Sequence, residues 1–174
     1  ALGGVLPAEF AALVHELLYR IKDLACVGVD LYLENLLGRA MNTGAREAGD
    51  QAVDLKVCNH TFAIDDLVPL GLITNELVTN SRKHAPGSRL HLHLRPDLQK
   101  GYVYEYWDEG PGPAPDFDIR KASTMGLRLV MILTEQQLKA SLDHDFRKGR
   151  GFAFRMVFKR QDYPENEGCI DTSP

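Results

Sequence analysis

Residues 70–85 read LGLITNELVTNSRKHA, and their pattern predicts an amphipathic helix around which the rest of the chain is organised. At about 100° per residue, five side chains share one face and are expected to be buried: Leu70, Thr74, Leu77, Val78 and Ser81. Glu76, Asn80 and Lys83 form a stripe beside that face, because residues three and four apart are neighbours on a helix.

The polar stripe places a carboxylate, a carboxamide and an ammonium group on adjacent turns. Glu76 could orient or deprotonate a nucleophile, Asn80 could bind a hard cation through its amide oxygen, and Lys83 could contact a phosphate. The other interpretation is an ordinary amphipathic helix with a solvated face. This stretch alone favours that simpler interpretation, so the choice depends on the rest of the chain.

The composition indicates one globular domain and argues against several classes of protein. The chain has 174 residues, 44% of them hydrophobic, and a formal net charge of −4. That charge leaves no basic footprint for nucleic acid or an anionic membrane, and no apolar run approaches the ~20 residues of a membrane-spanning helix. Three scattered cysteines and the lack of an N-terminal signal segment predict a reducing, cytoplasmic location.

Helical and strand periodicities follow one another in an order that predicts an α/β fold. Helices are expected at residues 8–24, 31–41, from Asp65 or Asp66 to His84 with Pro69 in the first turn, and 126–138. Strands are expected at residues 53–58, 88–95, 102–107, 140–145 and 151–159. Because the last strands follow in succession without helices between them, we predict a two-layer α/β sandwich, with a mixed sheet and helices on one face.

Three segments are expected along the chain. Residues 1–45 read as a helical hairpin leading from a dimerisation region, which makes a homodimer through the N-terminal helices possible. Residues 46–160 form the main domain, and residues 161–174 form a polar tail that we expect to be flexible.

The strand SRLHLHLR carries His91 and His93 on the face opposite to its leucines. A His-x-His pair could bind a metal ion, but more often it is simply the exposed face of a strand. With no third ligand in register, we expect the exposed face and no metal.

Three short motifs occur in a fixed order. Residues 75–85 read NELVTNSRKHA, residues 108–112 read DEGPG directly after an apolar strand, and residues 126–130 read GLRLV at the start of a helix. Each motif is weak alone, because Asp-x-Gly-x-Gly is a common turn composition and a glycine before a helix is commoner still. In this order and at these distances the set is much more specific.

Together the motifs resemble the ATP-binding catalytic domain of bacterial sensor histidine kinases, in the superfamily that also contains gyrase B, Hsp90 and MutL. They resemble, in order, the N box, the G1 box and the G2 box of that family, and the branch whose N box reads NELVTNALKHA is the most similar. The segment from Val14, VHELLYRIKDLACVGVDLYLENLL, also resembles the one that precedes the catalytic core in that branch. The resemblance covers roughly residues 12–158 and implies a Bergerat-type ATP-binding fold.

The resemblance also implies a function and a set of site residues. The domain would transfer the γ-phosphoryl group of ATP to a histidine, with Mg²⁺ as cofactor and a response regulator or a phosphoacceptor-histidine domain as partner. Glu76 would activate or orient the acceptor, and Asn80 would bind Mg²⁺. The residues expected to contact ATP are Asn80, Lys83, His84, Asp108, Gly110, Gly112, Gly126, Leu127 and Arg128. Residues 113–125 would form a short lid, from which Arg120 and Lys121 could reach the triphosphate.

The sequence departs from the family pattern at two points: the opening of the last strand, and the glycine pair that usually ends the helix after the G2 box, which is replaced here by Gln137-Leu138. The last strand of the family usually opens with Gly-Thr, and here Gly151 is followed by Phe152, which affects the contacts expected on that side of adenine. His15 is the tempting phosphoacceptor, but its segment matches one downstream of the acceptor. We therefore expect a catalytic fragment without its own substrate histidine. Two alternatives stay open: a degenerate domain used for docking or phosphotransfer, and a serine kinase of the same fold that acts on an anti-sigma antagonist.

Overall fold

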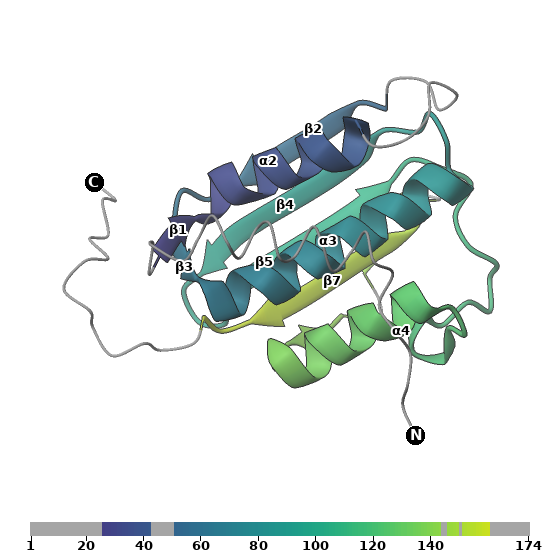
Figure 1. Cartoon of the computed structure of the whole chain (residues 1–174). Coiled ribbons are helices and arrows are strands. Elements are labelled where there is room, and N and C mark those ends of the chain that lie inside the picture. The colour runs from purple at the N-terminus through teal and green to yellow at the C-terminus, as the bar shows by residue number, and fades with distance from the viewer. Residues whose placement is uncertain (1–25, 43–50, 144–145, 150, 161–174) are drawn as a thin grey trace.

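The computed structural model describes residues 26–42, 51–143, 146–149 and 151–160, and Figure 1 shows their arrangement. Five strands form one mixed sheet in the order β2-β4-β5-β7-β6. Their bounds are Val53–Val57 for β2, Leu90–Asp97 for β4, Gly101–Asp108 for β5, Ser141–Leu142 for β6 and Ala153–Phe158 for β7. β2 runs parallel to β4, and the other neighbours are antiparallel. Two further strands, β1 (Cys26–Gly28) and β3 (Thr61–Ala63), pair as a short antiparallel ladder.

Three helices cover one face of the five-stranded sheet: α2 (Val29–Asn42), α3 (Ile64–His84) and α4 (Met125–Ile132) (Figure 1). The predicted two-layer α/β sandwich with a mixed sheet is therefore confirmed. A 3-10 turn, η1 (Ile119–Lys121), precedes α4, and a π-helical turn, η2 (Leu133–Gln137), continues it. Within the described residues, no helix is long and apolar enough to cross a membrane.

The central helix α3 is fixed to the sheet by its apolar face. All five residues expected on that face are buried, and burying each of its larger apolar side chains contributes about 1.5–3 kcal/mol. Two hydrogen bonds between α3 and β5 also fix the position of the helix along the strand. The Thr74 hydroxyl lies 2.8 Å from the Leu70 carbonyl oxygen and 2.9 Å from the Tyr104 hydroxyl, and the Tyr106 hydroxyl donates to the Leu77 carbonyl at 3.3 Å. The helix is thereby held in one position over β5.

The start of α3 differs from the sequence expectation. Neither Asp65 nor Asp66 caps the helix, because it begins at Ile64 after Ala63, whose side chain has no hydrogen-bonding group. Pro69 consequently lies inside the helix rather than in its first turn, although it is buried with the rest of the core face. The end is as expected: His84 is the last helical residue, and Pro86-Gly87 follows it.

The remaining elements agree with expectation apart from their bounds. The helix expected at 126–138 is α-helical only from Met125 to Ile132, and β6 is shorter than the strand expected at 140–145. Asp30, which directly precedes the helix expected at 31–41, lies in the first turn of α2. The helix expected at 8–24 and the tail from residue 161 lie outside the described residues.

The face of the sheet opposite the helices carries polar and aromatic side chains. The register places them side by side on neighbouring strands, in the pairs Asp54–His91, His91–Trp107, His93–Glu105 and Glu105–Arg155. We call this surface the histidine face. The alternation within β4, with leucines buried against the helices and histidines on the other side, confirms the two faces predicted from SRLHLHLR.

Candidate nucleotide site

Asp108 is the last residue of β5, and its carboxylate is enclosed by three donors. Its side chain is almost fully buried, with 2% of the residue exposed. One oxygen, Oδ1, accepts the backbone N–H of Gly110 at 2.9 Å and that of Phe152 at 3.2 Å. The other oxygen, Oδ2, accepts the Ser81 hydroxyl at 2.6 Å. The carboxylate therefore ties together α3, the loop after β5 and the start of β7.

These contacts leave one acceptor position on the carboxylate. Each carboxylate oxygen has two lone pairs. Two N–H groups fill Oδ1, whereas Oδ2 receives only the Ser81 hydroxyl from the part of the chain that the structure describes. The remaining lone pair belongs to Oδ2, on the side of the carboxylate that faces α3. A single N–H donor, such as one hydrogen of an exocyclic amine, matches that position.

The glycines around Asp108 are there because the chain passes too closely for a side chain. A Cβ added to Gly110 would overlap the Ala85 side chain at the end of α3, and one added to Gly151 would overlap the backbone oxygen of Asp108. Gly112 has a φ of 78°, a left-handed conformation that glycine adopts without strain. The DEGPG segment therefore lies directly against the C-terminal end of α3.

Asn80 lies one residue before Ser81 on α3 and has an unsatisfied polar atom. Its Nδ2 is buried and has no hydrogen-bond partner among the described residues. Amide oxygen and nitrogen are assigned from their surroundings, so the unpartnered position fits either an acceptor or a donor from a ligand. An unsatisfied buried amide costs about 1–3 kcal/mol. The side chain is therefore well placed to bind a group that the protein itself does not supply.

Glu76 lies one turn before Asn80 and faces the start of α4. A Cβ added to Gly126 would overlap Oε2 of Glu76, so the missing side chain of this glycine leaves the space that the carboxylate occupies. Burial raises the pKa of Glu76 above its ordinary value. The first motif and the third motif thus meet at a half-buried carboxylate beside a helix N-terminus.

The other side chains expected to contact the nucleotide take no part in the contacts described above. Lys83, His84 and Arg128 are exposed, and none of them makes an ion pair with another described residue. Leu127 is half-buried beside Gly126. Lys83 and His84 lie in the last turn of α3 and Arg128 lies on α4, and their exposed side chains are free to reorient toward a ligand.

The segment after the glycines folds over the start of β7. Phe117 packs edge-on against Phe152, with ring centroids 6.3 Å apart. A cavity of about 370 Å³ lies between this segment and the strands, and its lining includes Phe117, Gly151 and Phe152. Both Gly151 and Phe152 also contact Asp108. Arg120, which was expected to reach a triphosphate, instead pairs with Asp118 at 3.0 Å.

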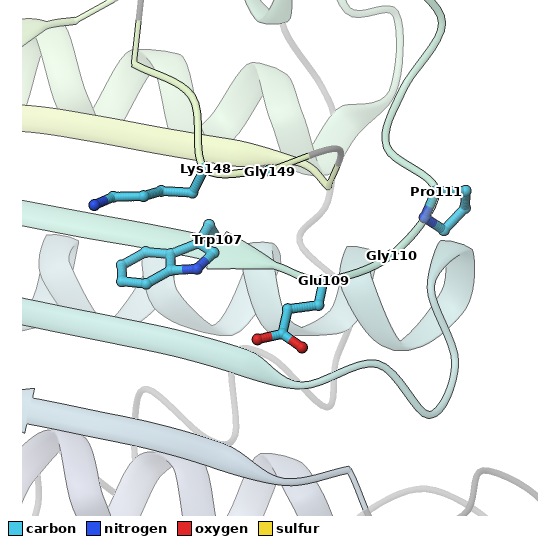
Figure 2. A pocket seen from close by; sticks show the side chains of 6 residues that line it. All are labelled: Trp107, Glu109, Gly110, Pro111, Lys148 and Gly149. Carbon is cyan, nitrogen blue, oxygen red and sulfur yellow. The ribbon is translucent and has the colours of Figure 1, made fainter.

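A second cavity, of about 710 Å³, lies on the histidine face (Figure 2). It is lined by Trp107, Glu109, Gly110, Pro111, Lys148 and Gly149. Figure 2 shows the Lys148 side chain beside the Trp107 ring, and its Nζ lies 5.2 Å from the ring centroid. No residue of α3 lines either cavity, so the polar edge of α3 is not part of them.

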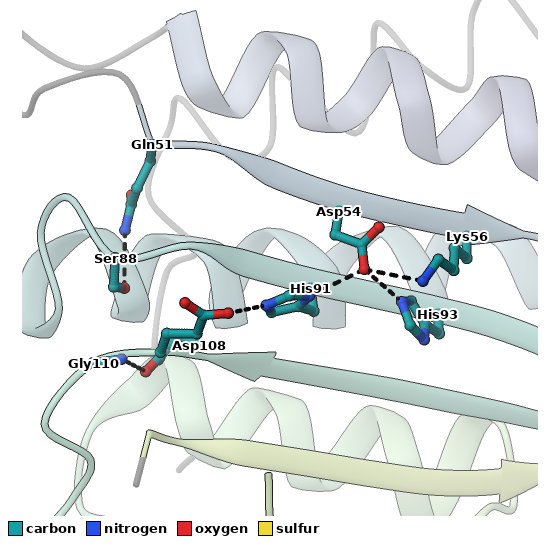
Figure 3. Close-up of polar contacts among 9 residues, drawn as sticks. Gln51, Asp54, Lys56, Ser88, His91, His93, Asp108 and Gly110 are labelled. Atoms are coloured by element: carbon teal, nitrogen blue, oxygen red, sulfur yellow. Dashed lines mark hydrogen bonds and ion pairs between the residues drawn. The ribbon is translucent and has the colours of Figure 1, made fainter. Parts of the chain in front are cut away.

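The expectation that no third ligand lies in register with His91 and His93 was wrong. Asp54 on β2 lies opposite His91, and its Oδ2 is 3.1 Å from His91 Nδ1 and 3.0 Å from His93 Nε2 (Figure 3). His91 is also buried rather than exposed. The sequence did not reveal Asp54 because the parallel pairing of β2 with β4 brings together residues that are far apart along the chain.

Three other contacts were missed, those of Ser81, Phe152 and Phe117. Ser81 was expected only as part of the buried face of α3, although it stands where the similar N box has alanine. Its polar side chain in a buried position was the available signal. Phe152 was expected to affect the contacts on that side of adenine, and the structure shows that its backbone N–H donates to Asp108. Phe117 gave no signal in the sequence, because its partner depends on how the segment folds.

Comparisons with known proteins point to one fold. Neither a family model nor a curated protein matches the sequence. The blue-light activated histidine kinase EL346 of Erythrobacter litoralis is similar in structure, with a TM-score of 0.74 at 20% identity over 87% of this chain. This chain spans 53% of that kinase.

Two smaller kinase structures are similar over most of their own length. The mycobacterial sensor histidine kinase MprB matches 78% of this chain and 98% of its own, with a TM-score of 0.57 at 20% identity. The catalytic domain of histidine kinase ThkA matches 78% and 95%, with a TM-score of 0.59 at 12% identity. The chain therefore has the fold of histidine kinase catalytic domains, the fold that its three motifs predicted.

Proposed function

We propose that this chain is the ATP-binding, phosphoryl-transferring domain of a two-component sensor kinase that works in the cytoplasm. The observation that carries the proposal is the buried carboxylate of Asp108, which three donors hold in place while one acceptor position stays open. The fold shared with histidine kinase catalytic domains supports it.

Asp108 would select adenine. The open lone pair on Oδ2 would accept one hydrogen of the exocyclic amine, and the close packing at Gly110 and Gly151 holds the carboxylate in place for that contact. Ser81 acts as a positioning residue, because its hydroxyl fixes the carboxylate from the α3 side. Guanine presents a carbonyl oxygen at the equivalent place, which would face the carboxylate as a second acceptor. The site would therefore bind adenine in preference to guanine.

Glu76 would act on the acceptor histidine. In the transfer, an imidazole nitrogen bonds to the γ-phosphorus while the bond from that phosphorus to the β–γ bridging oxygen breaks, and ADP leaves. The Glu76 carboxylate accepts the proton that the imidazole loses. A raised pKa suits this task, because it brings the base closer to the working pH. Its position against Gly126 would keep the carboxylate beside the phosphates.

Asn80 fits the Mg²⁺ that such a reaction uses. Its Nδ2 position, buried and without a partner among the described residues, supports the fit, because a turned amide would place its oxygen there and an amide oxygen is an ordinary ligand for this hard cation. When bound, Mg²⁺ neutralises charge on the phosphates. The exposed Lys83, His84 and Arg128, together with Leu127 and the N–H groups at the start of α4, would contact the rest of the nucleotide.

The wider assignment rests on the same proposal. The phosphate would pass to a histidine on another domain or chain and then to a response regulator. Residues 1–45 would lead from a dimerisation region, residues 46–160 would form the catalytic domain, and residues 161–174 would form the tail. A degenerate docking module is disfavoured, because it would have no need for an aligned, desolvated carboxylate at Asp108.

Calorimetric titration with a non-hydrolysable ATP analogue and Mg²⁺ tests the proposal. We expect binding at a single site, and much weaker binding of the corresponding GTP analogue. If millimolar adenine nucleotide gives no heat and no shift in melting temperature, the kinase assignment is wrong and the docking module becomes the better one.

Asn80→Asp separates metal-dependent catalysis from folding. The substitution keeps the shape of the side chain but places a charge in a buried position beside the phosphates. We expect the fold to persist and Mg²⁺-dependent transfer to be lost. Thr79→Ser, at the neighbouring exposed position, is the matched control and should behave as the unmodified chain does. Transfer that survives in Asn80→Asp would place the metal elsewhere.

A further inference from the structure

We propose that Asp54, His91 and His93 form a binding site for a divalent transition-metal ion, with Zn²⁺ as the representative. The site lies on the histidine face, on the opposite side of the sheet from α3 (Figure 3). It does not depend on the nucleotide site, because none of its three residues belongs to the motifs that carry the proposed kinase function.

The three ligand atoms converge in the way that a metal needs. The nearest ligand atoms of the three side chains all lie within 4.8 Å of one another. Two of the separations are 3.1 Å, from Asp54 Oδ2 to His91 Nδ1, and 3.0 Å, from Asp54 Oδ2 to His93 Nε2. In a tetrahedral site with bonds of about 2.0 Å, neighbouring ligand atoms are about 3.3 Å apart. Small rotations of the side chains would therefore suffice to admit the ion.

The backbone fixes two of these side chains firmly. His91 and His93 are two residues apart on β4, so both project from the same face, and the parallel ladder places Asp54 opposite His91. The side chains of His91, His93 and Asp54 are 11%, 20% and 28% exposed. This accessibility leaves room for a water molecule as fourth ligand, the arrangement of zinc sites with three protein ligands.

The contacts of the His91 ring suit a metal ligand. Both ring nitrogens face carboxylates: Nε2 lies 2.8 Å from Glu109 Oε1, and Nδ1 lies 3.1 Å from Asp54 Oδ2. An ion bound by Nδ1 and Asp54 would leave Nε2 to donate its N–H to Glu109. Glu109 would orient the ring as the outer carboxylate does in carboxylate–histidine–metal sites.

One contact opposes the metal. Lys56 Nζ lies 3.4 Å from Asp54 Oδ2, and its positive charge occupies the side that a cation would approach. The Lys56 side chain is 66% exposed, so it can swing into solvent at little cost. Replacing Lys56 with an uncharged residue should therefore strengthen metal binding, which is the opposite of the effect expected when a ligand residue is replaced.

Trp107 provides a built-in reporter. It is the one tryptophan in the sequence. Its ring stacks on His91, with centroids 4.5 Å apart and an interplanar angle of 5°, and it meets His93 edge-on at 4.7 Å. An ion bound by the two histidines lies beside this ring, so its emission should change during a titration.

The test is a titration of the whole chain with Zn²⁺, without nucleotide, followed by calorimetry and by Trp107 emission. We expect one equivalent to bind and the emission to change with the same midpoint. Asp54→Ala and His93→Gln should each weaken binding at least tenfold, Glu109→Gln about tenfold, and Lys56→Gln should strengthen it. His60→Gln, which changes a histidine outside the cluster, should bind as the unmodified chain does.

Two results would overturn the site. One is no Zn²⁺ binding up to millimolar concentration, in which case the two histidines only hydrogen-bond to Asp54. The other is binding of equal strength in the unmodified chain, Asp54→Ala and His93→Gln, which would place the metal elsewhere. Melting curves without metal establish that each variant is folded. Because nucleotide is absent, failure of this test leaves the proposed kinase function untouched.

Discussion

Asp108→Asn is the substitution that examines the proposed adenine contact most closely. Asparagine has the same shape and can keep its oxygen at the Oδ1 position, where the N–H groups of Gly110 and Phe152 donate. Its NH₂ group then replaces Oδ2 and can donate to the Ser81 oxygen, which reverses the direction of that hydrogen bond. The internal contacts therefore survive, and only the open acceptor position is converted into a donor.

The expected effects on folding and on binding differ in size. Three hydrogen bonds change from charge-assisted to neutral, which costs about 1 kcal/mol each. Removing a charge from a residue that is only 2% exposed offsets part of this cost. We expect the free energy of unfolding to fall by no more than about 2 kcal/mol. For nucleotide, the loss of a hydrogen bond to a charged group is worth about 1.5–3 kcal/mol, or roughly a tenfold to 150-fold weaker affinity.

The assay is calorimetric titration with the non-hydrolysable ATP analogue, alongside denaturant unfolding of the same samples. Asp97→Asn is the matched control, because Asp97 also accepts two backbone N–H groups, from Gln99 and Lys100, at the opposite end of the β4–β5 hairpin. The control should bind nucleotide with unchanged affinity. Equal affinity in Asp108→Asn and the unmodified chain would refute the assignment of Asp108 to adenine.

Three further predictions concern single side chains. Ser81→Ala removes the hydroxyl that holds Asp108, so we expect the fold to lose about 1–2 kcal/mol in denaturant unfolding, with weaker discrimination between ATP and GTP analogues; full discrimination would show that Ser81 does not position the carboxylate. Burial raises the pKa of Glu76 above 4.5, so the folded protein holds this proton more tightly than the unfolded chain and loses stability as pH rises through the raised value. Glu76→Gln should therefore melt at a higher temperature than the unmodified chain at neutral pH, with the difference vanishing below the ordinary glutamate pKa, and should lose phosphoryl transfer; an unchanged pH profile of the melting temperature would contradict this. A Cβ at Gly71 would overlap the Tyr32 hydroxyl, so Gly71→Ala should cost about 1–3 kcal/mol in denaturant unfolding, and Tyr32→Phe in the same chain should recover part of that loss; no recovery would mean that α2 and α3 meet differently.

The sequence predicted the parts of the fold that depend on local periodicity. The buried face of α3, the two faces of β4 and the position of Asp108 at a strand end all follow from spacing along the chain. The start of α3 did not follow, because its first turns are set by packing against α2 and β3 rather than by a capping side chain. Propensity is a weak guide where tertiary contacts decide.

The site was predictable only where a motif marks it. Asn80, Glu76 and Asp108 belong to motifs with fixed spacing. Ser81 and Asp54 do not, since their importance comes from partners on other elements, 27 and 37 residues away along the chain. Such contacts are created by strand pairing and by the docking of α3 on the sheet, which single-sequence patterns do not specify. Long-range register is therefore the information that the structure adds.

A crystal structure of the chain with the non-hydrolysable ATP analogue and Mg²⁺ would show where the nucleotide and the metal ion bind. We expect the adenine amine within hydrogen-bonding distance of Asp108 Oδ2, and the metal ion bound by the side-chain oxygen of Asn80 between α3 and α4. A base bound on the histidine face, in the cavity beside Trp107 and Lys148, would contradict this expectation.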